Sequence, residues 1–249
     1  YWMIKSSITV NSEMYVARPS LIAKHYTFEN YVDLFTKTEF PRALLNSLMI
    51  AFLTTVCCLL ISILGSYAMT RLKYPGRRFF KTSIIFSYLI PTAVLFVPMY
   101  VFVSKLGFYD NKWALLIIYP TTVVPYCCYM LMSYFKAIPY ALEEAALIDG
   151  CTRMKSLRYI ITPIALPGIA VVATFAFTMS WNEYLYAMIM TTSPAQQTAV
   201  VAISSFKYAD SAIWGRIMAA SVLTSLPVTI IYIVAQAQLI SGKSDGSVK

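Results

Sequence analysis

Residues 135–167 read FKAIPYALEEAALIDGCTRMKSLRYIITPIALP. This mostly polar stretch stands between two long apolar segments. Pro139 suits the first turn of a helix because it lacks an amide proton, and Gly150 can take the left-handed conformation that ends one. We predict a short helix over 139–149 and a second helix that begins within 151–158 and continues into the next apolar segment.

The predicted helix carries small residues on one side and acids at its start. The three- and four-residue spacing places Ala145, Ala146 and Asp149 together. Glu143 and Glu144 fall near the N-terminus, where the helix dipole favours negative charge. Small side chains permit close approach of another backbone, so we predict a rigid knob that binds a partner at the membrane surface. An ordinary connecting loop with an amphipathic helix is the alternative.

The composition is that of an all-α membrane protein. Hydrophobic residues make up 59% of the chain and charged residues only 12%, against about 25% charged in soluble globular proteins. Five charge-free stretches each exceed the ~20 residues that cross a bilayer as a helix. We predict five complete spans, over about 43–70, 82–104, 113–135, 159–188 and 214–240.

Basic residues predict the orientation of these spans. The link 71–81 carries Arg71, Lys73, Arg77, Arg78 and Lys81 without an acid, which is typical of a cytoplasmic loop. Counting outward places the 135–167 stretch and the C-terminal tail on the same side, and leaves residues 5–42, 105–112 and about 191–213 outside. Because the net charge of +9 is scattered over loops, a nucleic-acid groove is excluded.

The sequence lacks the residue combinations that metal, catalytic-triad and phosphate-binding sites require. The adjacent cysteines Cys57–Cys58 and Cys127–Cys128 lack C-x-x-C spacing, so they indicate packing rather than a metal site. His25 is the only histidine, and no serine, histidine and acid combination is plausible. No phosphate-cradling G-x-x-x-x-G-K-[ST] occurs either. We expect no catalytic residues, no metal and no cofactor.

Proline is frequent inside the predicted spans. Seven of the twelve prolines lie there: Pro91, Pro98, Pro120, Pro125, Pro163, Pro167 and Pro227. Proline frees backbone carbonyls, which lipid tolerates only when they face protein or water. We therefore expect kinked helices that surround a cavity or move against their neighbours, with ordinary kinked packing as the alternative.

One polar segment lies close to membrane depth, with the residues Trp181, Asn182, Glu183 and Tyr184. An ionisable residue within a span is by default a functional candidate. Aromatic faces beside Asn and Glu suit stacking and hydrogen bonding to a sugar, so these four residues are candidates for lining a pathway. They equally suit anchoring at the outer membrane interface, where Trp and Tyr are enriched.

Three stretches of the sequence resemble the permease subunits of ATP-driven importers. Glu144-Ala145-Ala146, Gly150 and Ile160-x-x-Pro163 resemble the EAA signature of this family, although Thr162-Pro163 stands where the family usually has Leu-Pro. The opening around Pro19 to Tyr31 and the end from Trp214 to Gly242 are similar to the carbohydrate branch, above all to the second permease of maltose-type importers.

This resemblance implies a type I ABC importer transmembrane domain over 1–249, with five complete spans and the remnant of a first. It implies a multi-pass protein of the bacterial inner membrane, surrounded by lipid, with a cytoplasmic C-terminus. The implied partners are a second permease, two cytoplasmic ATP-binding subunits and an external solute-binding protein. The implied solute is a sugar or oligosaccharide. A self-sufficient secondary transporter or channel is the alternative.

The resemblance also implies roles for particular residues. Cytoplasmic coupling helices over about 139–157 would fit a groove on an ATPase. Coupling falls on Glu144, Ala145, Ala146, Asp149, Gly150 and Pro163. The external loop Thr191 to Ile213 resembles the segment that docks with the binding protein, where Gln196, Gln197, Ser204 and Ser205 offer polar contacts.

Overall fold

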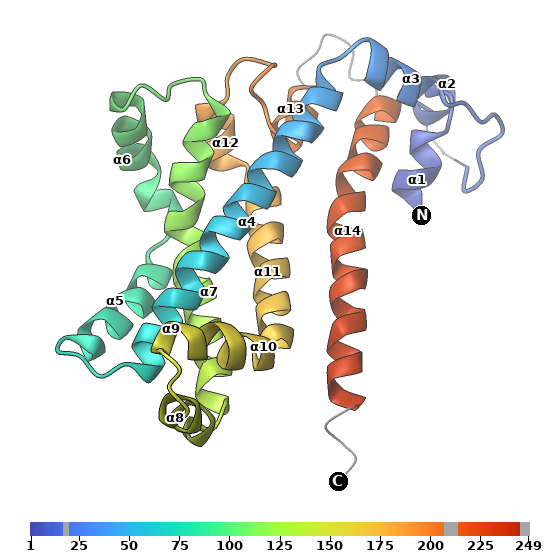
Figure 1. Cartoon of the computed structure of the whole chain (residues 1–249). Helices are drawn as coiled ribbons and strands as arrows, with labels where there is room; N and C mark the ends of the chain where they lie inside the picture. Colours follow the sequence, from blue (N-terminus) through green and yellow to red (C-terminus); the bar gives the residue numbers. More distant parts are fainter. Residues whose placement is uncertain (17–19, 207–213, 245–249) are drawn as a thin grey trace. The chain divides into compact units, whose positions relative to one another are not determined.

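A computed structural model describes residues 1–16, 20–206 and 214–244 of this chain, with side chains described as far as Gln236. The described elements are helices, and they form two compact units (Figure 1). Unit 1 comprises Tyr1–Ile50, Tyr100–Leu115 and Trp181–Ile230, and unit 2 comprises Ala51–Met99, Leu116–Ser180 and Ile231–Lys249.

Among the described residues, three uninterrupted helices are long and apolar enough to cross a membrane: Phe40–Arg71, Lys112–Ala137 and Trp214–Gln236. The first is α4 (Phe40–Arg71). The second combines a 3-10 turn with α7 (Leu115–Ala137), and the third belongs to α14 (Trp214–Ser244). Large apolar side chains remain exposed on them, including Phe52 at 61% and Ile230 at 58%, as lipid-facing helix surfaces require.

Two further candidate spans are sharply bent pairs of helices. The helices α5 (Arg77–Leu89) and α6 (Thr92–Lys105) meet at 99°. The break falls before Pro91, and Ile90 is extended with ψ 121° because the proline ring excludes helical backbone at the preceding residue. Counting each pair as one span gives up to five spans.

The second bent pair follows residues 135–150. It begins with α9 (Arg153–Ser156), continues through a π-helical turn (Leu157–Ile161) and α10 (Thr162–Ile164), and then bends by 82° into α11 (Leu166–Trp181). The bend falls between Ile164 and Leu166, next to Pro167, whose backbone nitrogen cannot donate a helical hydrogen bond. The expected kink is therefore present in this span.

The end of this span differs from the predicted 159–188. The helix α11 stops at Trp181, and a separate helix α12 (Leu185–Met190) follows. By contrast, Pro98, Pro120, Pro125 and Pro227 lie within continuous helices.

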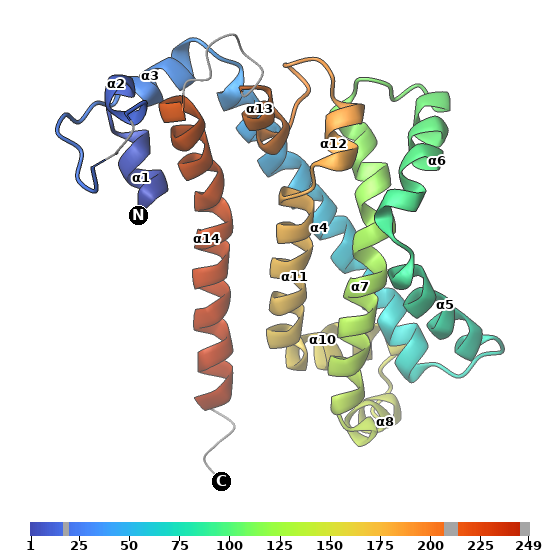
Figure 2. The same ribbon diagram turned by 180° about the vertical axis from the view of Figure 1, so that it is seen from behind.

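Unit 2 has its core between α4, α7 and α11. Cys58, Tyr67 and Ile63 of α4 meet Leu131 and Phe135 of α7 in this cluster, which continues along α11 to Ala176. The views of Figures 1 and 2 agree that α7 and α11 lie side by side. Cys58 and Cys127 are fully buried, so they occupy packing positions.

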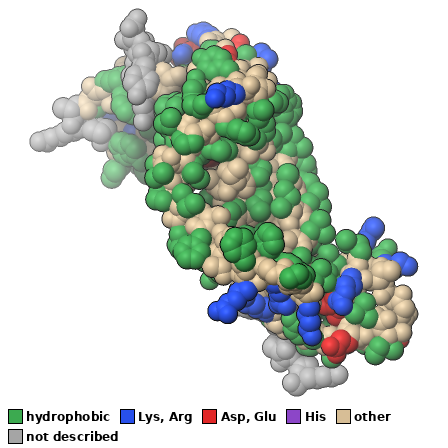
Figure 3. All heavy atoms as spheres, turned by 90° about the vertical axis from the view of Figure 1, so that its left-hand side faces the viewer, with side chains coloured by type: hydrophobic (Ala, Val, Ile, Leu, Met, Phe, Trp, Pro, Cys, Tyr) green, Lys and Arg blue, Asp and Glu red, His purple; other side chains and the backbone are tan. Residues whose placement is uncertain are grey.

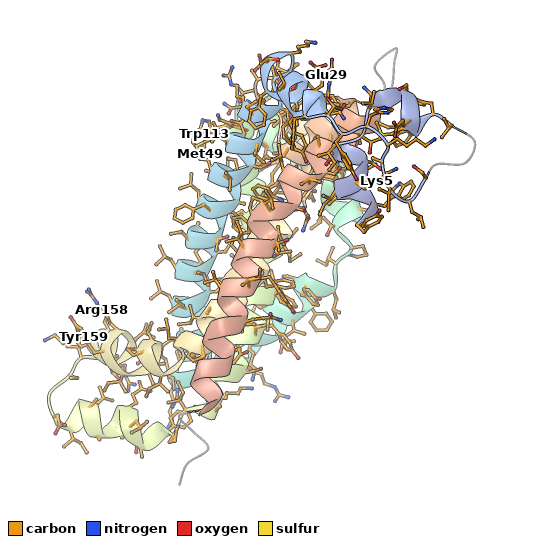
Figure 4. The ribbon with its side chains drawn as sticks, turned by 90° about the vertical axis from the view of Figure 1, so that its right-hand side faces the viewer. Lys5, Glu29, Met49, Trp113, Arg158 and Tyr159 are labelled. Carbon is orange, nitrogen blue, oxygen red and sulfur yellow. The ribbon has the colours of Figure 1, made fainter. Side chains whose placement is uncertain are left out.

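Unit 1 combines one end of each of several long helices with short ones: α1 (Trp2–Ser7), α2 (Asn11–Met14), α3 (Glu29–Thr36), α12 and α13 (Ala199–Ser205). Its core joins Leu34, Phe40 and Ala43 to small residues of α13 and α14. Asn30 lies so close to Gly215 that a Cβ atom there would stand 2.5 Å from the amide nitrogen and oxygen of Asn30. Lys5 of α1 lies beside α14 (Figure 4).

Candidate functional site

The short helix α8 (Tyr140–Ile148) lies within the mostly polar stretch 135–167. Its C-terminus closes with a Schellman motif, in which Cys151 N donates to Ala146 O at 2.9 Å and Gly150 N donates to Leu147 O at 3.2 Å. Gly150 has φ 85°, which confirms the predicted left-handed turn. The helix therefore ends in a fixed turn, and in Figure 1 it lies at the end of α7.

The residues predicted to couple this helix to an ATPase do not share one face. Glu144, Ala145 and Asp149 are exposed, but Ala146 is only 5% exposed. The prediction that Ala146 belongs to the outward contact is corrected, because this residue lies on the side of Glu143, which unit 2 covers. Ile148, which was not singled out, is 86% exposed.

The last predicted coupling residue lies in another helix. Pro163 is exposed and belongs to α10, beyond the π-helical turn. The chain turns between the two helices through Gly150 and begins α9 with Thr152, whose hydroxyl accepts from Lys155 N. Arg158 and Tyr159 of the π-helical turn point outward together in Figure 4, with the guanidinium carbon 5.5 Å from the tyrosine ring centroid.

A buried cluster of charged residues lies on the covered side of α8, the side that carries Glu143. Glu143 is 3% exposed. Its Oε1 accepts a hydrogen bond from the Tyr67 hydroxyl at 2.5 Å and lies 3.6 Å from Arg153 Nη1. Its Oε2 lies 3.8 Å from Nε of Arg71, whose side chain is fully buried. A carboxylate is tolerated in such a place only when it is paired and hydrogen-bonded.

Two arginines of this region also cap helix ends. Arg71 donates through Nη2 to the carbonyls of Phe135 and Ile138, at the end of α7. Arg77 donates to the carbonyls of Met69, Thr70 and Leu72 at 2.8, 2.8 and 3.1 Å, at the end of α4. The last carbonyls of a helix lack partners within the helix, and its dipole favours a cation there.

Reasoning from the sequence missed this cluster. It interpreted Arg71 and Arg77 only as signs of orientation and Glu143 only as an acid near a helix start. The available signal was weak: Arg71 directly follows an apolar run, and Glu143 is the first of two adjacent acids. Their meeting depends on α8 folding back beneath the end of α4, which no local pattern encodes.

The polar segment after α11 divides between two tasks. Trp181 and Asn182 line a cavity of about 360 Å³ in unit 1, and Trp181 Nε1 donates to Thr224 O at 3.1 Å. The opposite wall is one side of α14, with the hydroxyl residues Ser221, Thr224, Ser225 and Thr229. The residues that line this cavity carry no charge.

Glu183 has a different role in the structure. Its two carboxylate oxygens accept from Tyr186 N at 3.0 Å and Ala187 N at 3.1 Å, so the side chain caps the start of α12. Tyr184 is the residue immediately before that helix. The structure thus brings Trp181 and Asn182 to the cavity, whereas Glu183 caps the start of α12.

The loop that follows α12 packs within unit 1. Gln196 Oε1 accepts from Lys112 N at 3.3 Å, and Gln197 Nε2 donates to Thr192 O at 3.3 Å. Ser204 and Ser205 of α13 each donate to a carbonyl of their own helix at 2.7 Å. Residues 207–213 of the predicted docking segment lie outside the described residues.

Two residues that were not predicted hold this loop in place. Asn46 of α4 donates through Nδ2 to Ala195 O at 3.1 Å and Gln197 O at 3.0 Å. Asp110 accepts from the backbone amide of Ser193 at 2.8 Å and from its hydroxyl. These bonds from Ser193 hold the pKa of Asp110 below its usual range.

The part of the chain that the structure describes contains no group of three or more His, Cys, Asp or Glu residues that could hold a metal. The described chemistry is that of packing, ion pairing and hydrogen bonding.

Comparisons with known proteins identify the family. The model of the binding-protein-dependent transport system inner membrane component matches residues 61–243. The inner membrane ABC transporter permease protein YcjP of Escherichia coli K12 is 35% identical over 99% of this chain and 89% of its own length. The trehalose/maltose transport system permease protein MalG of Thermococcus litoralis is 33% identical over 100% of this chain and 90% of its own.

Solved structures agree on the fold. A chain of a bacterial ABC transporter that imports the acidic polysaccharide alginate has a TM-score of 0.83 at 22% identity, covering 95% of this chain and 88% of that one. A chain of the MetNI methionine ABC transporter in an inward-facing conformation has a TM-score of 0.64 at 19% identity, covering 82% and 95%. With the family match over most of the sequence, the chain belongs to the inner membrane components of binding-protein-dependent transport systems and is a permease subunit of an ABC importer.

Proposed function

We propose that this permease subunit couples to a cytoplasmic ATP-binding subunit through the exposed side of α8. The observation that carries the proposal is Ile148, an isoleucine 86% exposed at the tip of a short helix that the Schellman turn at Gly150 holds rigid. Ala145, three residues before Ile148 in the same helix, is also exposed. A large exposed apolar side chain on a rigid knob is suited to a groove on another protein.

The distribution of charge supports a cytoplasmic position for α8 and for the C-terminus. Lys73, Arg78, Arg153, Lys155 and Arg158 of unit 2 are all exposed. Figure 3 shows Lys and Arg side chains gathered at the lower end of the view, beside an extended apolar surface. Loops rich in Lys and Arg remain in the cytoplasm during insertion.

The proposed solute is a neutral sugar or oligosaccharide. Relatives are named for trehalose and for trehalose/maltose transport. The cavity beside Trp181 and Asn182 supports this class because it offers an amide, hydroxyl groups and no charge. We assign Trp181 and Asn182 to the pathway, which this chain would form with a second permease.

The proposed contact with an external solute-binding protein is the loop after α12. Gln196, Gln197, Ser204 and Ser205 remain the candidate residues, although each already makes a hydrogen bond within unit 1. Asn46 and Asp110 hold the loop in one conformation, which lowers the entropy lost when a partner binds.

The test of α8 is copurification and uptake in the complex with its partner permease, two ATP-binding subunits and the binding protein. Ala145→Trp adds bulk to the exposed side, and Ile148→Asp replaces the apolar contact by a charge. We expect both complexes to lose ATP-binding subunits or to hydrolyse ATP without uptake, while membrane insertion persists.

Ile22→Asp is the matched control, because Ile22 is also an exposed isoleucine, at 70%, but lies in unit 1. This variant is expected to retain both ATP-binding subunits. Normal subunit stoichiometry and normal uptake in both Ala145→Trp and Ile148→Asp would remove α8 as the coupling element.

A further inference from the structure

Glu143 lies where four helical segments of unit 2 meet. Its own helix is α8, Tyr67 and Arg71 come from the end of α4, and Arg153 begins α9. Arg71 reaches in addition to the last carbonyls of α7. One carboxylate and one guanidinium therefore connect the proposed coupling helix to the ends of two long spans.

The surroundings of these charges differ on the two sides. Arg71 is fully buried, and its Nε and Nη1 have no hydrogen-bond partner within the described part of the chain. Arg153 is 56% exposed on the other side of the carboxylate. A cavity of about 940 Å³ adjoins the cluster and is lined by Arg71, Tyr140, Glu143 and Arg153 among others.

Stability alone is a poor explanation for such a cluster. A buried ion pair loses in desolvation about as much as it gains in attraction, and apolar side chains of similar volume stabilise a fold equally well. Once built, however, the pair strongly resists separation, because parting the charges leaves each buried without its partner. A contact that adds little net stability but resists being pulled apart is suited to transmitting movement.

We propose that Glu143 and Arg71 form the joint that transmits movement of α8 to the ends of α4 and α7. The proposal rests on the proposed role of α8 as the ATPase contact. Exposed residues of α8 receive the movement, and Glu143, on the covered side of the same helix, passes it to Tyr67 and Arg71. Glu143 and Arg71 are positioning residues, since neither is required to touch the solute or ATP.

The test uses two nearly isosteric substitutions in the complete transporter. Glu143→Gln removes the charge and Tyr67→Phe removes the hydroxyl that donates to it. Glu29→Gln and Tyr129→Phe are the matched controls, because both residues are exposed and lie outside the cluster. For each complex the measurements are subunit stoichiometry, ATP hydrolysis and solute uptake per ATP hydrolysed.

We expect the Glu143→Gln and Tyr67→Phe complexes to retain the ATP-binding subunits and to hydrolyse ATP. Solute uptake per ATP hydrolysed should fall about fivefold or more, because about fivefold is the lower end of the coupling usually found between two sites. Both controls should keep the normal ratio. A merely structural cluster would lower the yield or thermal stability of the complex and leave uptake per ATP unchanged.

The proposal is overturned if uptake per ATP is unchanged in Tyr67→Phe and, provided that its complex assembles, also in Glu143→Gln. If Glu143→Gln fails to assemble, Tyr67→Phe decides, because it keeps both charges. The result also separates the two proposals. Loss of ATP-binding subunits in Ala145→Trp with normal coupling in Tyr67→Phe would reject only the joint. Full activity of both Ala145→Trp and Ile148→Asp would reject the ATPase contact itself.

Discussion

Single residues fix the direction of the chain at both candidate contacts. Gly150 turns the backbone after α8 with φ 85°, and a Cβ built there would meet no described atom within 4 Å beyond the adjoining residues of the chain. The constraint at Gly150 is therefore backbone conformation and not space. In the loop after α12, Asp110 and Asn46 set the course of 191–198 through hydrogen bonds to Ser193 and to the carbonyls of Ala195 and Gln197.

Substituting Gly150 by valine should misdirect the segment that follows α8. A β-branched residue at this left-handed position is strained by ~1 to 3 kcal/mol. We expect Gly150→Val to insert into the membrane but to bind ATP-binding subunits weakly or to hydrolyse ATP without uptake. Gly150→Asn is the control, because asparagine tolerates left-handed backbone, and it should retain most of the uptake. Equal, normal uptake in both variants would contradict this account.

The loop after α12 should respond to acid through Asp110. Since the folded state lowers the pKa of Asp110, its contribution to stability is complete above the unfolded pKa of about 3.9 and is lost as pH falls through the lower folded value. Hydrogen exchange of Ser193, corrected for its intrinsic pH dependence, should therefore be constant from about pH 7 to 5 and rise only in stronger acid. Asp110→Asn should remove this rise, and an identical rise in that variant would exclude Asp110 as its source.

At the scale of elements, the charge-free runs located the long helices because burial in lipid excludes charge along their whole length. The spans predicted over 43–70 and 113–135 correspond to the helices Phe40–Arg71 and Lys112–Ala137 in the structure. The break after Trp181 was not predicted, because Glu183 was interpreted as a pathway or interface residue. Its role as the cap of α12 becomes visible only once the backbone turns between α11 and α12. The burial of Ala146 was missed for a similar reason, since the spacing shows which residues share a face and not what covers it.

The two roles in the segment after α11 can be separated. Asn182 lines the cavity and Glu183 caps α12, so Asn182→Leu should lower solute uptake at unchanged assembly. Glu183→Gln keeps acceptor capacity at the cap and should transport almost normally, whereas Glu183→Ala should destabilise α12 by about 0.5–2 kcal/mol. Uptake kinetics and thermal unfolding of the three complexes check this, and a normal Asn182→Leu would assign the segment to interfacial anchoring.

At the scale of the whole molecule, composition and the spacing around Glu144 and Gly150 were enough to predict a membrane permease and its family. The family match removes the alternative of a self-sufficient secondary transporter. The charge cluster around Glu143 could not be predicted, because it joins residues from 67 to 153 through the tertiary fold. The solute was not determined by sequence either, since a neutral, hydroxyl-lined cavity suits many sugars.

The proposed orientation can be tested by labelling from each side of the membrane. In a background lacking the native cysteines, Gly76→Cys lies in the basic link and Gln196→Cys in the outer loop. An impermeant maleimide should label Gln196→Cys from outside and Gly76→Cys only from the cytoplasmic side. Labelling of both positions from the same side would contradict the five-span arrangement.

The central claim, that this chain is a permease of an ATP-driven sugar importer, is tested most directly by uptake into proteoliposomes. The chain is reconstituted with its partner permease and two ATP-binding subunits, with ATP inside and the binding protein with radiolabelled trehalose or maltose outside. The account predicts sugar uptake that stops when ATP, the ATP-binding subunits or the binding protein is omitted. Uptake of either sugar by the permease pair alone, driven by an ion gradient and indifferent to ATP, would contradict it.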